Sequence, residues 1–305
     1  MGPQVRAAMV QLCKSGRAEV LIDLVERAPN ESAAAPVWEF LAGERILESL
    51  LEQPRVNLAL VSRLARRKGA SAAPALVSAA ITFADAKTRI QLFDLIHSLG
   101  DDAGPAVAER IAAAPPLLQR ELLGLLGRMT TLPSGFSAHD YLVQGEPLVR
   151  REAVKLLLRD PSSREDTIMR ALADADDRVV FVGLTAAQDG CPQDGFALIR
   201  ERVDASELDS QLRTMGIRII AQQRTPETLS WLLSQVVAEG RWPRRLRLRP
   251  SSPEMLAALS VIASGWRDDP AADAALKLAD QSNVEEIRMK LSRARGPSPD
   301  SVARR

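Results

Sequence analysis

Aromatic residues are scarce in this 305-residue chain: Phe, Trp and Tyr together make up 4% of it, and there is a single Tyr. Hydrophobic residues nevertheless reach 46%, so the core has to be built largely from Ala, Leu, Val and Ile. Small and aliphatic side chains suit closely packed helices better than a β-sandwich, whose faces favour aromatic and β-branched residues. The composition therefore favours an all-α fold.

The side chains that most often carry catalysis or bind metals are also few. The only histidines are His97 and His139, and no spacing of His, Cys or carboxylate residues resembles a metal site. Cys13 and Cys191 have no CxxC partner, so we expect two small, buried or half-buried thiols of a reducing compartment. No Gly-rich phosphate loop or nucleophile–base pair stands out. We predict no catalytic residue, no cofactor and no metal.

An excess of charge and a long apolar run are both missing. With 40 basic and 39 acidic residues, the balance argues against wholesale nucleic-acid binding, which needs a local electrostatic excess. The uncharged stretch 70–84 is too short and too rich in Ser and Ala to span a bilayer, so we expect no membrane insertion. No charged segment followed by an apolar core opens the chain. We expect a cytoplasmic protein, and the excess of Arg over Lys indicates a GC-rich bacterial genome.

A regular ladder of small and aliphatic residues runs through most of the chain. Steps of 32, 30, 31, 31 and 32 residues separate its members Leu60, Leu92, Leu122, Ala153, Leu184 and Gly216. Mostly apolar residues also stand four positions before and after each member. A spacing of four keeps side chains on one face of an α-helix, and recurrence at a fixed period is typical of repeat arrays. The ladder predicts a series of equivalent helices.

Turn signals between these helices predict a second helix in each repeat. At 160–163, Asp-Pro-Ser-Ser ends one helix and caps the next, because proline cannot continue the hydrogen-bond pattern and Asp or Ser accepts free N–H groups. The expected pairs are two helices within 5–28, then 56–67 with 71–84, 86–99 with 103–113, 116–129 with 137–144, 147–159 with 165–173, 178–188 with a helix ending near 203, and 207–223 with 226–238. Single helices follow at 253–266, 270–281 and 284–294. A long helix at 36–52 fits no pair, so the pairing within 29–55 stays open.

One ladder helix carries a family resemblance. Residues 148–158, Leu-Val-Arg-Arg-Glu-Ala-Val-Lys-Leu-Leu-Leu, resemble the first helix of HEAT repeats, in the form shared with the HEAT-like repeats of bacterial phycobilin lyases. Arg89 and Arg150 stand at the Arg position of that motif, and Arg213 echoes it, whereas Gln119 and Phe181 depart from it. The resemblance implies a right-handed α–α superhelix, a HEAT-like solenoid of about eight or nine helix pairs. We assign residues 1–295 to it and expect 296–305 to be a disordered tail.

About twelve extra residues interrupt the period after Gly216, and we interpret 240–252 as an insertion loop. Its candidate partner-binding residues are Arg241, Trp242, Arg244, Arg245, Arg247 and Arg249. Guanidinium groups form bidentate hydrogen bonds with carboxylate or phosphate and stack on aromatic rings. We expect the apolar residues Trp242, Leu246 and Leu248 to hold the loop down with the Arg side chains outward. The alternative interpretation is a solvated connector whose Arg residues pair with nearby acidic turns.

The second helices of the repeats offer another candidate surface. In HEAT arrays they line the concave face, so the resemblance implies that Arg164, Arg170, Arg200 and Arg202 face into it. Acidic residues alternate with them, and a groove of mixed charge suits a protein segment better than a polyanion. We therefore predict a non-enzymatic scaffold or adaptor that binds a protein partner through the concave face and the Arg-rich loop.

Two alternatives stay open. The first is an enzyme or enzyme subunit of the lyase-like or DNA-glycosylase-like HEAT type. It would need Trp231, Trp242 and Trp266 to converge around a carboxylate in an open cleft, and Asp268 and Asp269 read more simply as a helix cap. The second is a nucleic-acid binder, whose affinity would fall steeply with added salt.

Overall fold

The structure, a computed structural model, describes residues 2–28, 31–41, 43–53, 56–239 and 246–295. It is an all-α protein: apart from one pair of three-residue strands, the regular structure of these residues is helical. The chain divides into two compact units, Met1–Leu156 and Leu157–Arg305, which we call unit 1 and unit 2. Residues 296–305, predicted to be disordered, lie outside the described residues.

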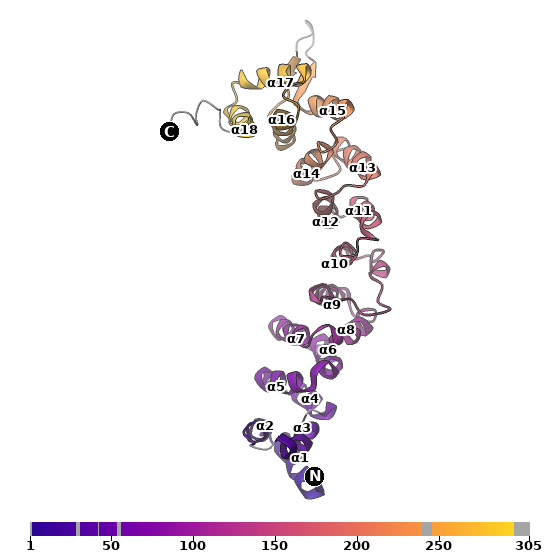
Figure 1. Cartoon of the computed structure of the whole chain (residues 1–305), viewed down its shortest axis with the longest axis vertical. Coiled ribbons are helices and arrows are strands. Elements are labelled where there is room, and N and C mark those ends of the chain that lie inside the picture. The colour runs from indigo at the N-terminus through magenta and orange to yellow at the C-terminus, as the bar shows by residue number, and fades with distance from the viewer. Residues whose placement is uncertain (1, 29–30, 42, 54–55, 240–245, 296–305) are drawn as a thin grey trace. The chain divides into compact units, whose positions relative to one another are not determined.

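Unit 1 is a succession of short helices joined by tight turns (Figure 1). Its α-helices are α1 (Pro3–Lys14), α2 (Ala18–Glu26), α3 (Glu31–Leu41), α4 (Glu44–Leu51), α5 (Leu58–Lys68), α6 (Ala73–Thr82), α7 (Ala86–Ser98), α8 (Gly104–Ile111), α9 (Pro116–Arg128) and α10 (Pro147–Leu157). Single 3-10 turns lie at Gly69–Ala72, Asp101–Ala103 and Ala138–Tyr141. The ladder residues Leu60, Leu92, Leu122 and Ala153 are all buried, as their spacing predicts.

Two expectations for unit 1 were wrong. The single helix at 36–52 is two helices, α3 and α4, which Gly43 separates. A Cβ atom on Gly43 would lie 3.1 Å from the Phe40 carbonyl oxygen, so glycine allows this close turn. The expected helix at 137–144 is only the 3-10 turn Ala138–Tyr141. Pro133 and Gly135 lie just before this turn. Proline cannot continue a helix, and the φ of 80° at Gly135 is not helical, so the chain enters the turn without helical geometry.

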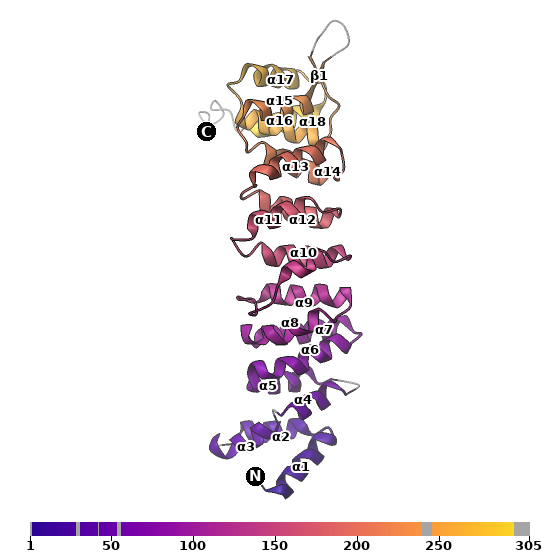
Figure 2. The same ribbon diagram turned by 90° about the vertical axis from the view of Figure 1, so that its right-hand side faces the viewer.

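Unit 2 contains two rows of helices (Figures 1 and 2). Its α-helices are α11 (Arg164–Leu172), α12 (Asp177–Ala187), α13 (Gln193–Asp204), α14 (Ser210–Ile220), α15 (Pro226–Val236), α16 (Pro253–Gly265), α17 (Pro270–Asp280) and α18 (Glu285–Arg295). In one row α12 packs on α14, α14 on α16 and α16 on α18. In the other row α11 packs on α13 and α15 on α17. One continuous hydrophobic core runs between the rows, from Ile168 to Leu291.

Glycines allow the two rows to approach closely. A Cβ atom on Gly183 of α12 would lie 2.8 Å from the Ala171 Cβ and 3.1 Å from the Leu172 backbone nitrogen of α11. At the ladder position Gly216 of α14, a Cβ atom would lie 2.8 Å from a methyl group of Ile199. Since real Cβ atoms almost never come within 3.0 Å of such neighbours, the helix pairs α11–α12 and α13–α14 depend on these glycines.

The insertion forms a β-hairpin rather than a loop after a longer helix. Helix α15 ends at Val236, and the strands β1 (Val237–Glu239) and β2 (Leu246–Leu248) pair antiparallel, with Val237 opposite Leu248. Leu248 packs against the core of unit 2 as predicted, but Leu246 is 48% exposed. The expectation that Leu246 anchors the insertion was therefore wrong. Trp242, the third expected anchor, lies outside the described residues.

Candidate functional site

The Arg position of the repeat motif has a structural role. Arg89 at the start of α7 donates to the carbonyl oxygens of Phe83 and Ala84, each at 3.0 Å. Arg150 of α10 donates in the same way to the carbonyls of the residues six and five positions before it, at 2.8 and 3.1 Å. Arg213 of α14 donates to the Leu208 carbonyl. Each guanidinium thus satisfies carbonyl groups of the turn that precedes its own helix.

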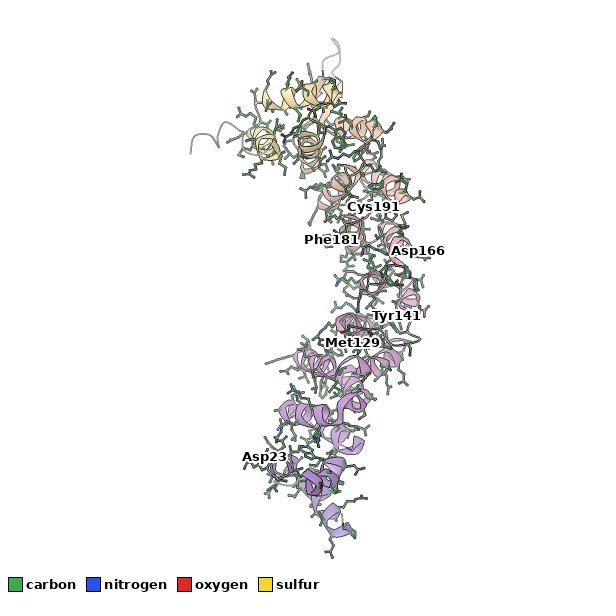
Figure 3. The ribbon with its side chains drawn as sticks, in the orientation of Figure 1. Asp23, Met129, Tyr141, Asp166, Phe181 and Cys191 are labelled. Carbon is green, nitrogen blue, oxygen red and sulfur yellow. The ribbon has the colours of Figure 1, made fainter. Side chains whose placement is uncertain are left out.

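Two of these arginines also reach the next helix of the same row. Arg89 pairs with Glu121 of α9 at 3.1 Å, and Arg213 pairs with Glu254 of α16 at 2.7 Å. Burial raises the pKa of Glu254, but hydrogen bonds from its own backbone N–H, from Ser210 and from Arg213 outweigh burial and lower it overall. Phe181, which replaces the Arg on α12, is instead 43% exposed (Figure 3). These Arg–Glu pairs join α7 to α9 and α14 to α16, and they leave no free charge for a ligand.

Two of the predicted binding arginines of unit 2 are occupied within the fold. Arg202 of α13 donates to the Leu172 and Asp174 carbonyls at the end of α11 and lies 3.5 Å from the Glu207 carboxylate. Arg164 of α11 donates to the Ala186 carbonyl of α12 at 3.0 Å. Both guanidinium groups are thus engaged at helix ends, and partner binding by these two residues stays a prediction.

The other two predicted arginines lie at the surface. Arg170 pairs with Asp166 at 2.7 Å, one turn earlier on α11, and Asp166 is on the side of α11 away from α12 (Figure 3). Arg200 of α13 lies 5.6 Å above the Trp231 ring. In Figure 1 the row α11, α13, α15 and α17 follows the outer side of the bend within unit 2. The prediction that the four arginines line the concave face of a solenoid concerns the whole array and stays a prediction.

Arg200 borders a groove of about 410 Å³ between α13 and α15, which we call the α13 groove. The Asp204 carboxylate at its edge accepts hydrogen bonds from the Trp231 indole N–H at 2.9 Å and from the Gln235 amide at 3.4 Å. It also lies 4.0 Å from the Arg200 guanidinium. Three donors already surround this carboxylate, so it braces α13 against α15 and does not stand free as a general base.

The tryptophans do not form the open cleft that the enzyme alternative needs, as far as the described residues extend. Trp231 is only 4% exposed and packs in the core. Trp266 is half-buried, and the Arg224 guanidinium lies 4.7 Å from the centre of its ring. Asp269 accepts from the N–H groups of Ala271 and Ala272, as predicted for a helix cap.

Asp101, in the 3-10 turn before α8, joins two segments that are distant in the sequence. Its carboxylate accepts from the backbone N–H groups of Thr130 and Thr131, at 2.9 and 2.8 Å. It thus holds the segment after α9 against the start of α8. Among the described residues, no three His, Cys, Asp or Glu side chains come together in a way that would hold a metal ion.

Two predicted arginines, Arg247 in β2 and Arg249 just after it, are free. Arg247 and Arg249 are exposed, and no hydrogen bond or ion pair joins either guanidinium to another described residue. Their backbone is held: Arg247 stands opposite Ala238, and the Arg249 N–H donates to the Val236 carbonyl at 2.8 Å. The other predicted residues of the insertion, Arg241, Trp242, Arg244 and Arg245, lie outside the described residues.

Sequence reasoning missed a groove in unit 1. It has a volume of about 660 Å³ and lies between α2, α3 and α5; we call it the Trp38 groove. Its lining includes Trp38, Arg63, Arg66 and Arg67. The run Arg66-Arg67-Lys68 at the end of α5 was a signal that the sequence carried, but basic residues at a helix C-terminus are common for electrostatic reasons alone. Only the packing brings Trp38 beside that run.

Comparison with protein-family models and with characterised proteins finds no match to this chain. Among the described residues, every helix is too short or too polar to cross a bilayer.

Proposed function

We propose that this protein is a HEAT-like α-solenoid that serves as a non-enzymatic scaffold and binds a protein partner. The period of 30 to 32 residues supports the solenoid, because an array of equivalent helix pairs buries each repeat against its neighbours. The repeated use of Arg89 and Arg213 to join one ladder helix to the next supports it as well. Solenoids of this kind present long surfaces to protein partners.

The free arginines Arg247 and Arg249 support the partner-binding surface best. Most other predicted arginines that the structure describes cap a helix end or pair with a carboxylate, whereas Arg247 and Arg249 do neither. Alternate residues of a strand point to the same face, so the two guanidinium groups share one face of the hairpin. The backbone hydrogen bonds of the hairpin hold the two residues in place, which lowers the entropic cost of binding. Such a pair fits carboxylates of an acidic protein segment.

The test is capture of partners from the native host followed by mass spectrometry, with two variants of equal charge change. The first is Arg247→Glu with Arg249→Glu. The matched control is Arg218→Glu with Arg288→Glu, two exposed arginines of unit 2 whose side chains also make no hydrogen bond or ion pair with another described residue. We expect the hairpin variant to lose the partner and the control variant to keep it.

Melting curves accompany the capture. Exposed charge changes usually alter stability by no more than about 0.5 kcal/mol, so both variants should melt close to the parent protein. Retention of the partner by the hairpin variant would rule out the hairpin as its binding surface. Early melting of that variant would instead mean that the arginines brace the fold.

A further inference from the structure

The Trp38 groove of unit 1 combines an apolar wall with free positive charge. Helices α2 and α3 contribute the apolar side chains Val25, Ala34 and Trp38, and Ala28 follows the end of α2; Trp38 is half-buried. Helix α5 contributes Arg63, Arg66 and Arg67 on the other side. A ligand in this groove would therefore meet an indole ring and guanidinium groups at the same time.

The three arginines differ in what they can offer a ligand. Arg63 is neutralised by α2: its guanidinium lies 2.7 Å from the Asp23 carboxylate and 2.5 Å from that of Glu26. Figure 3 shows Asp23 on the side of α2 that faces α5. Arg63 thus joins α2 to α5 and forms a wall of the groove, and its charge is already compensated.

Arg66 and Arg67 form the basic side of the groove. The Arg67 guanidinium lies 5.7 Å from the centre of the Trp38 ring, within the range of a cation–π contact. Arg66 is exposed, and no hydrogen bond or ion pair joins its side chain to another described residue. Arg66 is therefore the guanidinium group of this groove that is available to a ligand.

Arg66 also borders a second groove, of about 320 Å³, between α5 and α7. Leu58 and Leu95 contribute apolar surface there, and Asp94 contributes a carboxylate that pairs with Arg128 at 2.8 Å. Arg66 therefore stands on a ridge with an apolar hollow on each side. An extended chain that crossed α5 could place one apolar side chain in each hollow and an acidic side chain on the ridge.

We propose that this surface binds a short segment of a partner protein in which an acidic residue lies close to large apolar residues. The acidic residue pairs with Arg66, and an apolar residue packs beside Trp38. A nucleic acid fits less well, because it carries a phosphate at every nucleotide, whereas Asp23 and Glu26 already compensate the Arg63 guanidinium. The site lies in unit 1 and uses no residue of the β-hairpin, so it stands or falls independently of the hairpin surface.

The experiment follows the indole N–H signal of Trp38 in the ¹⁵N-labelled full-length protein. The chain has four Trp, and Trp38→Phe identifies the signal by its loss. The probes are synthetic peptides that hold one Asp-Glu pair and one Leu-Phe pair at separations from zero to three residues. A second set carries Lys in place of Asp and Glu, a third carries Ser in place of Leu and Phe, and oligothymidylate is the nucleic-acid probe.

We expect at least one acidic peptide with Leu-Phe to shift the Trp38 signal, and the Lys and Ser sets to leave it in place. Because a charge-assisted contact contributes on the order of 1.5–3 kcal/mol, Arg66→Glu should weaken binding by about tenfold or more. Arg110→Glu, an exposed arginine of α8 away from the groove, is the matched control and should bind as the parent protein does.

Several results would overturn the proposal. The Trp38 signal could stay in place with every acidic peptide, or Arg66→Glu and Arg110→Glu could bind alike. Tighter binding of oligothymidylate at Trp38, lost on addition of salt, would assign the groove to nucleic acid. Circular dichroism of Arg66→Glu, together with the milder Arg66→Ala, separates lost binding from lost folding.

Discussion

Individual polar side chains in this protein mostly complete hydrogen bonds of the backbone. Arg89, Arg150, Arg202 and Arg213 all donate to carbonyl groups at turns or helix ends. Such carbonyls lack partners within their own helix, so a nearby guanidinium stabilises the helix ends and the contact between helices together. These four arginines therefore act within the fold.

The pair of Arg213 with Glu254 leads to a prediction about pH. Glu254 has a lowered pKa in the folded protein, so it stabilises the fold above its unfolded pKa of about 4.3, and this stabilisation is lost as the pH falls through the folded value. Glu254→Gln should therefore lower the free energy of unfolding at pH 7. The difference from the parent protein should shrink as the pH falls below about 4.3 and vanish below the lowered folded pKa, where the parent Glu254 is protonated as well.

Denaturant unfolding of both proteins from pH 7 to pH 3 measures this difference. Arg213→Ala should also destabilise, by about 1–3 kcal/mol, whereas Arg218→Ala on the exposed side of the same helix should have little effect. A gap between parent and Glu254→Gln that stays constant down to pH 3 would mean that the ion pair contributes nothing.

The cysteines allow a second prediction at the residue scale. Burial raises the pKa of the Cys191 thiol to about 11, from an ordinary value of 9.0, and it raises the pKa of Cys13 as well. The thiolate is the reactive form, so at pH 8 alkylation of Cys191 should be about a hundredfold slower than that of an exposed thiol. Iodoacetamide labelling followed by peptide mass spectrometry measures the rate. Labelling as fast in the native protein as in denaturant would contradict the burial of this thiol.

At the scale of single helices, glycine has opposite effects at two positions. A Cβ atom on Gly183 would come within 3.1 Å of the backbone of α11, so Gly183→Ala should force α12 away and cost roughly 1–3 kcal/mol. Gly124 in α9 has nothing within 4 Å of such an atom. Since Ala has the higher helix propensity, Gly124→Ala should stabilise the protein by about 0.5–1 kcal/mol.

Thermal unfolding of the two variants beside the parent protein tests this contrast. Both variants add the same methyl group. Changes of opposite sign in melting temperature can therefore come only from the surroundings of that group. If Gly183→Ala melts at or above the melting temperature of the parent protein, α11 and α12 do not pack as closely as the structure shows.

At the scale of the whole molecule, each helix is stabilised by the neighbours on either side. Leu184 and Leu291 are both fully buried, but α12 packs on α11 and α14, whereas α18 closes its row and packs on α16 and α17. In a repeat array an end helix can detach without unfolding the rest. Leu184→Ala should therefore destabilise the whole of unit 2 by about 2–5 kcal/mol.

The matched variant Leu291→Ala should instead release α18 locally. Hydrogen exchange with mass spectrometry separates the two results, because faster exchange should be confined to residues 285–295 in Leu291→Ala and spread through unit 2 in Leu184→Ala. If the faster exchange extended through unit 2 in both variants, α18 would unfold together with the rest of the unit.

The amino-acid sequence by itself determined the helices and their buried faces. The period of the ladder and the turn residues predicted most helix ends to within a few residues, because hydrophobic spacing and capping are local properties. Only the tertiary structure decided which polar and aromatic side chains pair with one another and which remain available to a ligand. Asp101 accepts from Thr130 and Thr131, Arg202 donates to the end of α11, and Trp38 meets Arg67. These partners lie about 30 residues apart, and their pairing depends on how the repeats stack, which no local pattern records.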